Sequence, residues 1–222
     1  MNGWCNINLW QRCQRREDDF FTSLGLQAFT GLEYFNGTGL VSMVHAIRPP
    51  LDDGPVLLKS RFWLAEQSVV SCAGIDEATL WQWNHGGHLV IYPGEKISFE
   101  TVKLRLMSHA KNLRIREVAV DRFFDLNCAV DLDRRGLNVV GFGQGYTSMH
   151  QPVLDFESDL QSRRIIHDGN PVLEWCVRNT AIERNSEGRL KPSRRHSAGP
   201  IGGAIAAMMA LARLRQAQTV TV

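Results

Sequence analysis

The sequence lacks any long apolar segment. Its longest run without Asp, Glu, Lys, Arg or His, residues 197–212, contains Pro200 and is shorter than the roughly 20 residues that a membrane span needs, so it predicts a buried helix. The N-terminus also lacks the uninterrupted apolar core of a signal peptide. We therefore expect a cytoplasmic protein with no membrane partner.

The chain has little net charge and no cysteine motif. Its 25 basic and 23 acidic residues leave a net charge of +2, so attraction to nucleic acid requires a local basic patch. The cysteines are widely spaced, without a Cys-x-x-Cys pair, which predicts buried free thiols rather than a disulfide framework or a zinc knuckle.

The commonest nucleotide-binding and catalytic motifs are also missing. No Gly-x-x-x-x-Gly-Lys-Ser/Thr loop and no Gly-x-Ser-x-Gly elbow occurs, so neither an ATPase nor a serine hydrolase is indicated. The segment 141–145 has glycines at alternate positions, but Tyr146 stands where a dinucleotide fingerprint needs its third glycine. We expect a glycine-rich turn there and no nucleotide cofactor. His85 and His88 flank two glycines and predict a surface turn rather than a metal site.

The composition that remains is that of an ordinary globular protein. Of 222 residues, 44% are hydrophobic and 22% charged, which predicts one domain with a substantial core. Residues 11–19 are almost wholly polar and show no persistent period. We therefore expect a loosely attached N-terminal arm over residues 1–27 and the domain over residues 28–222.

Alternation of polar and apolar residues predicts two kinds of organisation along the domain. Three strands joined by short turns should be antiparallel neighbours: residues 28–34, 40–47 and 56–63. Helices and strands then alternate, as helix 98–110, strand 115–120, helix 124–134, strand 137–140 and a helix from about residue 147. Such alternation implies parallel strands with crossover helices. Closed by a helix of small residues at 202–215, this order predicts an α/β fold of the ribonuclease H (RNase H) type: a mixed sheet of three antiparallel strands followed by βαβα units, with flanking helices.

Two carboxylates stand at the ends of strands in this arrangement. Glu33 lies near the end of the first strand, and Asp121 ends the strand 115–120. On adjacent central strands they are able to hold Mg²⁺ or Mn²⁺ for phosphodiester cleavage. Two other interpretations remain open: Asp121 caps the next helix, and Glu33 points to solvent from an edge strand.

A basic segment precedes the last helix. It contains Arg184, Arg189, Lys191, Arg194, Arg195 and His196. Its position suits contacts with a phosphate backbone near Asp121, while a solvated loop is the alternative.

From about Phe29 onward the sequence resembles the C-terminal nuclease part of the large terminase subunit of tailed bacteriophages. The resemblance rests on seven segments in the family's order: residues 31–33, 62–64, 120–123, 142–149, 167–173, 201–203 and 208–211. It implies an RNase H-like, two-metal endonuclease that cuts concatemeric viral DNA during packaging. The family's partners are double-stranded DNA, the portal and the small terminase subunit. Its ATPase motor has no counterpart in this sequence.

The family's three metal-binding acids correspond here to Glu33, Asp121 and Gly202. Only Asp121 matches the family, because Glu33 stands for an aspartate and Gly202 offers no ligand. A displacement of 1 Å at such a site can reduce the rate by about a hundredfold. Weak or lost binding of Mg²⁺ or Mn²⁺ is therefore expected, unless Asp125 or Asp168 substitutes. Two hypotheses follow: a metal-dependent endonuclease of reduced activity, or a DNA-binding or packaging-partner domain of prophage origin without catalysis.

Overall fold

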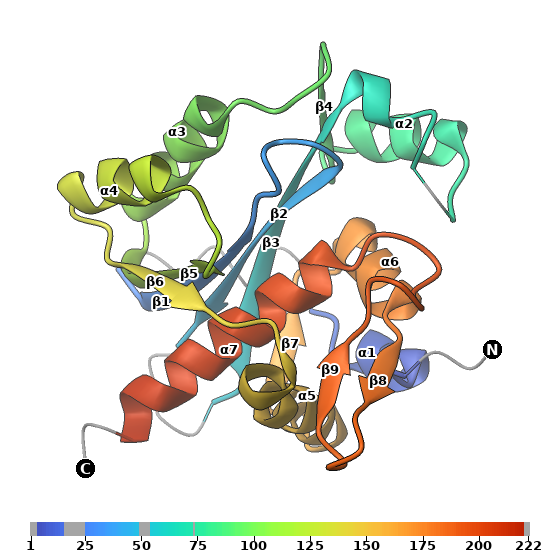
Figure 1. The fold of residues 1–222 in the computed structure, drawn as a ribbon, viewed down its shortest axis with the longest axis vertical. Helices are drawn as coiled ribbons and strands as arrows, with labels where there is room; N and C mark the ends of the chain where they lie inside the picture. Colours follow the sequence, from blue (N-terminus) through green and yellow to red (C-terminus); the bar gives the residue numbers. More distant parts are fainter. Residues whose placement is uncertain (1–3, 16–24, 49–53, 73, 220–222) are drawn as a thin grey trace.

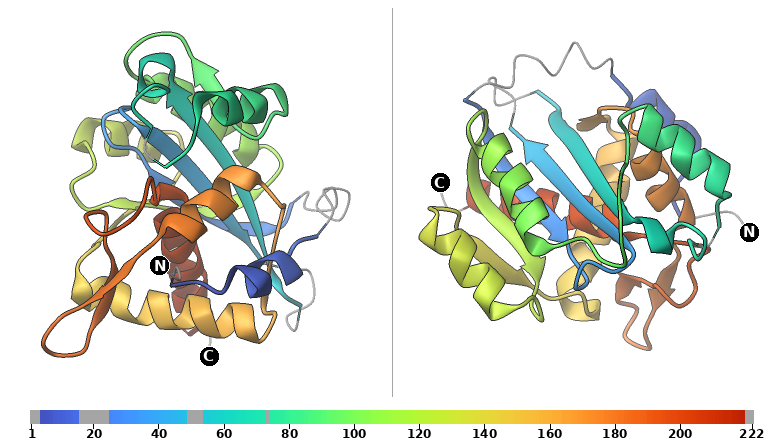
Figure 2. Two further views of the ribbon diagram at one scale, coloured as in Figure 1. Left: turned by 90° about the vertical axis from the view of Figure 1, so that its right-hand side faces the viewer. Right: turned by 90° about the horizontal axis from the view of Figure 1, so that it is seen from above.

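The computed structural model describes residues 4–15, 25–48, 54–72 and 74–219 of the chain. A central twisted sheet carries helices on both faces (Figures 1 and 2). Its six principal strands lie in the order β4-β3-β2-β1-β5-β6, and β7 pairs with the opposite end of β3 from β4. The strands are β1 (Gln27–Glu33), β2 (Leu40–Ile47), β3 (Val56–Ala65), β4 (Val90–Tyr92), β5 (Arg114–Asp121), β6 (Val139–Phe142) and β7 (Ile165–His167).

The pairing directions are those expected from the sequence. β1, β2 and β3 are antiparallel neighbours, and β5 and β6 continue the sheet in parallel from β1. A separate two-stranded hairpin is formed by β8 (Ile182–Arg184) and β9 (Leu190–Pro192). The RNase H-type order of strands is therefore confirmed, with β4, β7 and the β8–β9 hairpin as additions.

Helices cover the two faces of the sheet separately. One face packs against α3 (Phe99–Ala110) and α4 (Leu126–Arg134), and the other against α5 (Tyr146–Gln161), α6 (Pro171–Asn179) and α7 (Gly202–Thr219). The remaining helical elements are α1 (Ile7–Arg12), α2 (Glu77–His85) and a single 3-10 turn at Glu66–Ser68.

The long helix α7 lies directly on β1 and β2. All of its residues from Gly202 to Leu211 are buried, as the run of small and apolar residues predicts. A Cβ on Gly31 would overlap the carbonyl oxygen of Ala206, so the helix backbone approaches β1 as closely as glycine allows. A Cβ on Gly203 would stand 2.9 Å from the Phe62 ring. These contacts fix the position of α7 on the sheet.

The N-terminal segment differs from the sequence expectation. Residues 4–15 are firmly attached rather than loose, because Trp10 of α1 is fully buried and stacks on His167 with ring centroids 3.9 Å apart. The His167 Nε2 atom lies 2.9 Å from the Trp10 carbonyl oxygen. Trp10 and His167 are 157 positions apart in the sequence, which explains why a local period did not reveal the contact. Residues 1–3 and 16–24 of the predicted arm lie outside the described residues.

Two further expectations concern the cysteines and the membrane. The five cysteines are free thiols as predicted; Cys5, Cys13 and Cys176 are buried, whereas Cys72 and Cys128 are only half-buried. No helix in the described parts of the chain is long and apolar enough to cross a membrane.

Candidate active site

The two acids predicted as a site lie at the C-terminal ends of two adjacent strands. Glu33 is the last residue of β1 and Asp121 the last of β5, and the preceding residues Leu32 and Val120 are paired in parallel register. Because β1 lies between β2 and β5, Glu33 is not on an edge strand. Its exposure is only 7%, so the alternative in which it points to solvent is wrong.

Both carboxylate oxygens of Glu33 already have hydrogen-bond donors. Gln144 Nε2 donates to Oε1 and an Arg194 guanidinium nitrogen donates to Oε2. The same guanidinium nitrogen donates to Gln144 Oε1 at 3.1 Å, which closes a three-residue network. Burial raises the pKa of Glu33, and Asp121 raises it further, while Arg194 and Gln144 act in the opposite direction. The buried carboxylate is thus satisfied by protein groups alone.

Asp121 organises the turn that follows its strand. Its Oδ1 accepts a hydrogen bond from the Phe123 amide at 2.8 Å, while its backbone carbonyl accepts from the Phe124 amide at 2.8 Å. The cap of α4 is Asp125 instead, which accepts from the Cys128 amide at 3.0 Å. The alternative in which Asp121 caps the next helix is therefore wrong, and Asp125 is committed to that role.

Gly202 faces Glu33 from the first turn of α7. A Cβ built on Gly202 would lie 3.5 Å from the Glu33 Cβ and 3.0 Å from the Ser42 hydroxyl oxygen. Ser42 stands opposite Glu33 in the β1–β2 register and is fully buried. Its hydroxyl has no hydrogen-bond partner among the described residues. An unsatisfied hydroxyl therefore faces the position where the resemblance places the third acid.

The donor set does not fit a two-metal centre. Within the described residues, no group of three His, Cys, Asp or Glu side chains is arranged to hold a metal ion. Asp168 is not a substitute, because its carboxylate accepts from the Ser60 amide at 2.9 Å and from the Ser60 hydroxyl at 3.2 Å, on β3 and two strands away from β1. A guanidinium instead provides the positive charge beside Glu33.

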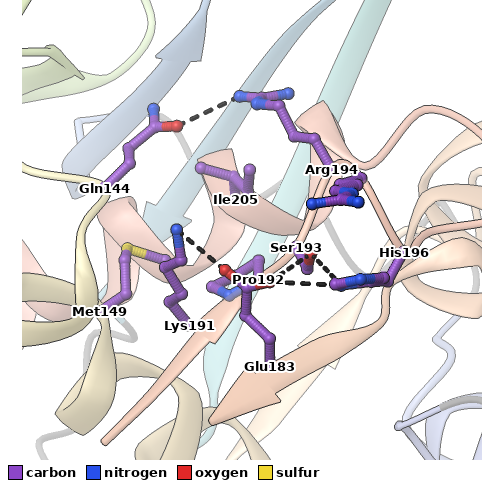
Figure 3. Close-up of a pocket in the computed structure, with 10 residues that line it drawn as sticks. Gln144, Met149, Glu183, Lys191, Pro192, Ser193, Arg194, His196 and Ile205 are labelled. Atoms are coloured by element: carbon purple, nitrogen blue, oxygen red, sulfur yellow. Dashed lines mark hydrogen bonds and ion pairs between the residues drawn. The ribbon is translucent and has the colours of Figure 1, made fainter. Parts of the chain in front are cut away.

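The predicted basic segment forms the β8–β9 hairpin and the loop behind it. Its residues 191–196 line a cavity of about 450 Å³ together with Gln144, Glu183 and Ile205 (Figure 3). In Figure 3 the Arg194 side chain points to Gln144, away from the cluster around Glu183. Arg194, two residues after β9, therefore connects the hairpin to Glu33 of the acid pair.

The cations of this segment have different surroundings. Lys191 pairs with Glu183 at 2.9 Å, and hydrogen bonds from Lys191 and Ser193 lower the pKa of Glu183 to about 2. Arg189 donates to the Thr147 hydroxyl at 3.0 Å, and His196 Nδ1 lies 3.2 Å from Glu183. The remaining two cations, Arg184 and Arg195, have no acidic partner among the described residues. Arg184 donates to the Gly188 carbonyl at 2.9 Å, and Arg195 is exposed.

Sequence reasoning missed two members of this site, Gln144 and Ser42. Gln144 lies in the glycine-rich turn between β6 and α5, and the turn brings its amide to Glu33. The sequence held one indication of Gln144, which lies in segment 142–149, one of the segments that carry the resemblance to the terminase family. Ser42 gave no local signal, because its importance arises from facing Gly202 across the interface between α7 and β2.

The sheet order and its flanking helices define an RNase H-like α/β domain, with two acids at the ends of neighbouring strands. The family model described as "Terminase large subunit, endonuclease domain" matches residues 2–218. The chain therefore belongs to this family.

Individual relatives agree with this assignment. The chain is 24% identical to Protein YmfN of Escherichia coli strain K12, over 96% of this chain and 48% of that protein. It is 26% identical to the terminase large subunit of Enterobacteria phage HK97, over 82% of this chain and 36% of that protein. This chain thus spans half or less of the length of these relatives.

Solved structures show the same fold. The HK97 large terminase superposes with a TM-score of 0.83 at 23% identity, covering 95% of this chain and 43% of that one. The large terminase nuclease of thermophilic phage G20c with bound magnesium superposes at a TM-score of 0.56 and 10% identity, covering 90% and 85%. Divalent metal is thus bound in a nuclease domain of this fold, whereas the donor set described above is incomplete.

Proposed function

We propose that this chain is a terminase nuclease domain that binds double-stranded DNA and whose metal-dependent cleavage is impaired. The observation that carries the proposal is the state of Glu33, whose two oxygens are held by Arg194 and Gln144 while Gly202 contributes no ligand. A divalent cation at Glu33 would have to displace a guanidinium from a buried carboxylate. Mg²⁺ or Mn²⁺ binding should therefore be weak.

DNA binding itself does not require the metal. The β8–β9 hairpin and the loop behind it present Arg184, Arg189 and Arg195 at exposed positions. Phosphate contacts from such arginines position a duplex without reading its sequence. The portal and the small terminase subunit are the protein partners proposed from the family, in the cytoplasm of a bacterial host. A prophage origin agrees with relatives in both a bacterium and a phage.

The second candidate is a DNA-binding or packaging-partner domain that has lost catalysis altogether. The donor set described above favours it as strongly as it favours a weakened nuclease. Titration with Mn²⁺ in a calorimeter, together with plasmid cleavage in the presence of Mn²⁺, separates the two. A weakened nuclease should show binding heats and slow nicking, and an inactive domain should show neither.

Restoration of the acids provides the sharper test. Gly202→Asp combined with Glu33→Asp should raise Mn²⁺-dependent plasmid cleavage by about a hundredfold or more over the unmodified chain. The change should be tolerated, because an aspartate in the first turn of α7 is favoured by the helix dipole and a small shift of the Ser42 hydroxyl accommodates its Cβ. The Ser42 hydroxyl would then donate a hydrogen bond to the new carboxylate.

Two controls make this test specific. Gly202→Ala with Glu33→Asp makes similar backbone and packing changes without adding a ligand at position 202, and should leave cleavage at the starting level. Asp121→Asn added to the restored pair should abolish the gain, because it withdraws a charged ligand at nearly constant shape. If the restored pair stays folded by circular dichroism and still fails to cleave, a latent nuclease site is refuted.

A further inference from the structure

Each acid of the site is followed, two residues later, by an exposed phenylalanine. Phe35 after Glu33 is 78% exposed, and Phe123 after Asp121 is 85% exposed. Because the two acids end neighbouring parallel strands, both rings project from the same edge of the sheet. Two large apolar side chains are thus presented to solvent, each just beyond one acid of the pair.

The turn that carries Phe35 is rigidly built. The Phe35 carbonyl oxygen accepts hydrogen bonds from the Thr38 amide at 3.0 Å and the Thr38 hydroxyl at 2.9 Å. Asn36 adopts a left-handed conformation with φ of 51°, and the Gly37 carbonyl accepts from the Ile97 amide at 2.9 Å. The exposed ring is therefore held on an ordered turn.

The turn that carries Phe123 is fixed by Asp121 and has a cation beside its ring. The Phe123 amide donates to Asp121 Oδ1, and the Arg122 guanidinium carbon lies 5.2 Å from the Phe123 ring centroid. An exposed aromatic ring and an exposed positive charge thus stand side by side, directly after the acid.

Inward-facing aromatic residues tie the two turns together. Tyr34 and Phe124, which adjoin the exposed rings, have centroids 6.3 Å apart and both pack on Phe99 at 5.5 and 5.6 Å. The Tyr34 hydroxyl donates to the Ile97 carbonyl at 2.9 Å. Each turn therefore packs one half-buried aromatic residue inward and exposes the other, and the inward pair holds the two turns together.

We propose that Phe35 and Phe123 form an aromatic clamp that inserts against unstacked bases of duplex DNA at the acid pair. This inference rests on the proposed DNA binding. Apolar side chains inserted at a base step unstack it, and a base stacked on an aromatic ring stabilises the complex. DNA is favoured over a protein partner because the clamp is continuous with the acid pair and carries Arg122, whose charge complements phosphate. The ligand class is therefore a duplex with a weakened or opened step.

Binding to two labelled duplexes tests the clamp, one fully paired and one with a central mismatch, by fluorescence anisotropy without divalent metal. The unmodified chain should bind the mismatched duplex roughly tenfold more tightly, since its bases are already partly unstacked. Phe35→Ala with Phe123→Ala should lose this preference while retaining the affinity for the paired duplex. Phe35→Trp with Phe123→Trp should keep the preference, because indole also stacks.

Controls separate the clamp from the general DNA affinity. Leu104→Ala on α3 removes another exposed apolar side chain, 62% exposed, and should change neither affinity. Arg195→Ala should weaken binding to both duplexes equally. If neither duplex binds, the proposed DNA binding itself fails. If both bind without preference, or if the alanine pair changes only the oligomeric state measured by light scattering, the clamp is refuted.

Discussion

Strands β1 and β2 carry two polar pairs on opposite faces of the sheet, and only one of the pairs is complete. Thr30 opposes His45, and three residues further along β1, Glu33 opposes Ser42. All four residues are buried. Because side chains alternate along a strand, Thr30 belongs to the face covered by α3 and Glu33 to the face covered by α7.

The first pair is closed by its own neighbours. Thr30 Oγ1 lies 2.8 Å from His45 Nδ1, and His45 Nε2 lies 2.7 Å from Nδ1 of His109 at the end of α3. The second pair is closed on one side only, since Glu33 is satisfied by Arg194 and Gln144 while the Ser42 hydroxyl lacks a partner in the described parts of the chain. The first network uses all of the polar side-chain atoms that it brings together, whereas the second leaves one buried hydroxyl group unused at the interface with α7.

Acidification should have the largest effect, and it acts on the closed pair. Burial lowers the pKa of His109 to about 4 and that of His45 well below its usual range, and Arg61 and Lys59 act in the same direction. The unfolded chain therefore takes up protons more readily than the folded chain below about pH 6.5. The stabilisation is complete above that pH and is lost as the pH falls towards 4. His109 alone should cost about 1.4 kcal/mol per pH unit.

Urea unfolding followed by circular dichroism at a series of pH values measures this slope. His109→Gln keeps a hydrogen-bonding side chain but removes one titrating ring, so its free energy of unfolding should fall less steeply with acidification. Equal slopes in the two proteins would show that other groups dominate the acid response.

A smaller effect is expected when the closed pair is opened. Thr30→Val keeps the shape but leaves His45 Nδ1 without its partner, and should lower the free energy of unfolding by about 2 kcal/mol. Chemical denaturation at neutral pH measures the loss. Thr147→Val is the matched control, because it removes a hydroxyl that accepts an exposed hydrogen bond from Arg189, with an expected change of about 0.5 kcal/mol or less. A similar small change at both positions would contradict the contrast between the pairs.

The smallest effect, with the opposite sign, is expected at the open pair. Ser42→Ala removes a buried hydroxyl that has no partner among the described residues, and should raise the free energy of unfolding by about 1 kcal/mol. In the Gly202→Asp background the same substitution should be destabilising, because the hydroxyl then has a carboxylate to bind. A double-mutant cycle measures this reversal. The absence of any coupling would mean that Ser42 does not face an added acid.

Features that depend on local periodicity were predictable from the sequence. The turns around Asn36 and the small residues of α7 marked the ends of strands and a close helix–sheet contact, and these predictions are confirmed. The glycines at 141–145 formed the predicted turn between β6 and α5.

Features that depend on distant partners were not predictable in this way. Trp10 is buried against residues more than a hundred positions away, so the polar pattern of residues 11–19 gave no sign that α1 packs on the domain. The contact between Arg194 and Glu33 joins residues 161 positions apart, and periodicity carries no information about such a pair. The same holds for Gln144, whose role requires the β6–α5 turn to end beside β1.

Because α7 packs against the backbone of Gly31, this glycine sets the distance between the helix and the strand that carries Glu33. Gly31 meets Ala206, one helical turn beyond Gly202, and Glu33 lies two residues further along the strand. Any bulk at position 31 would lift the helix and carry position 202 away from the acids. A carboxylate introduced at position 202 would lie beside Glu33 only while position 31 remains glycine, so the effect of that substitution depends on a residue that takes no part in the chemistry.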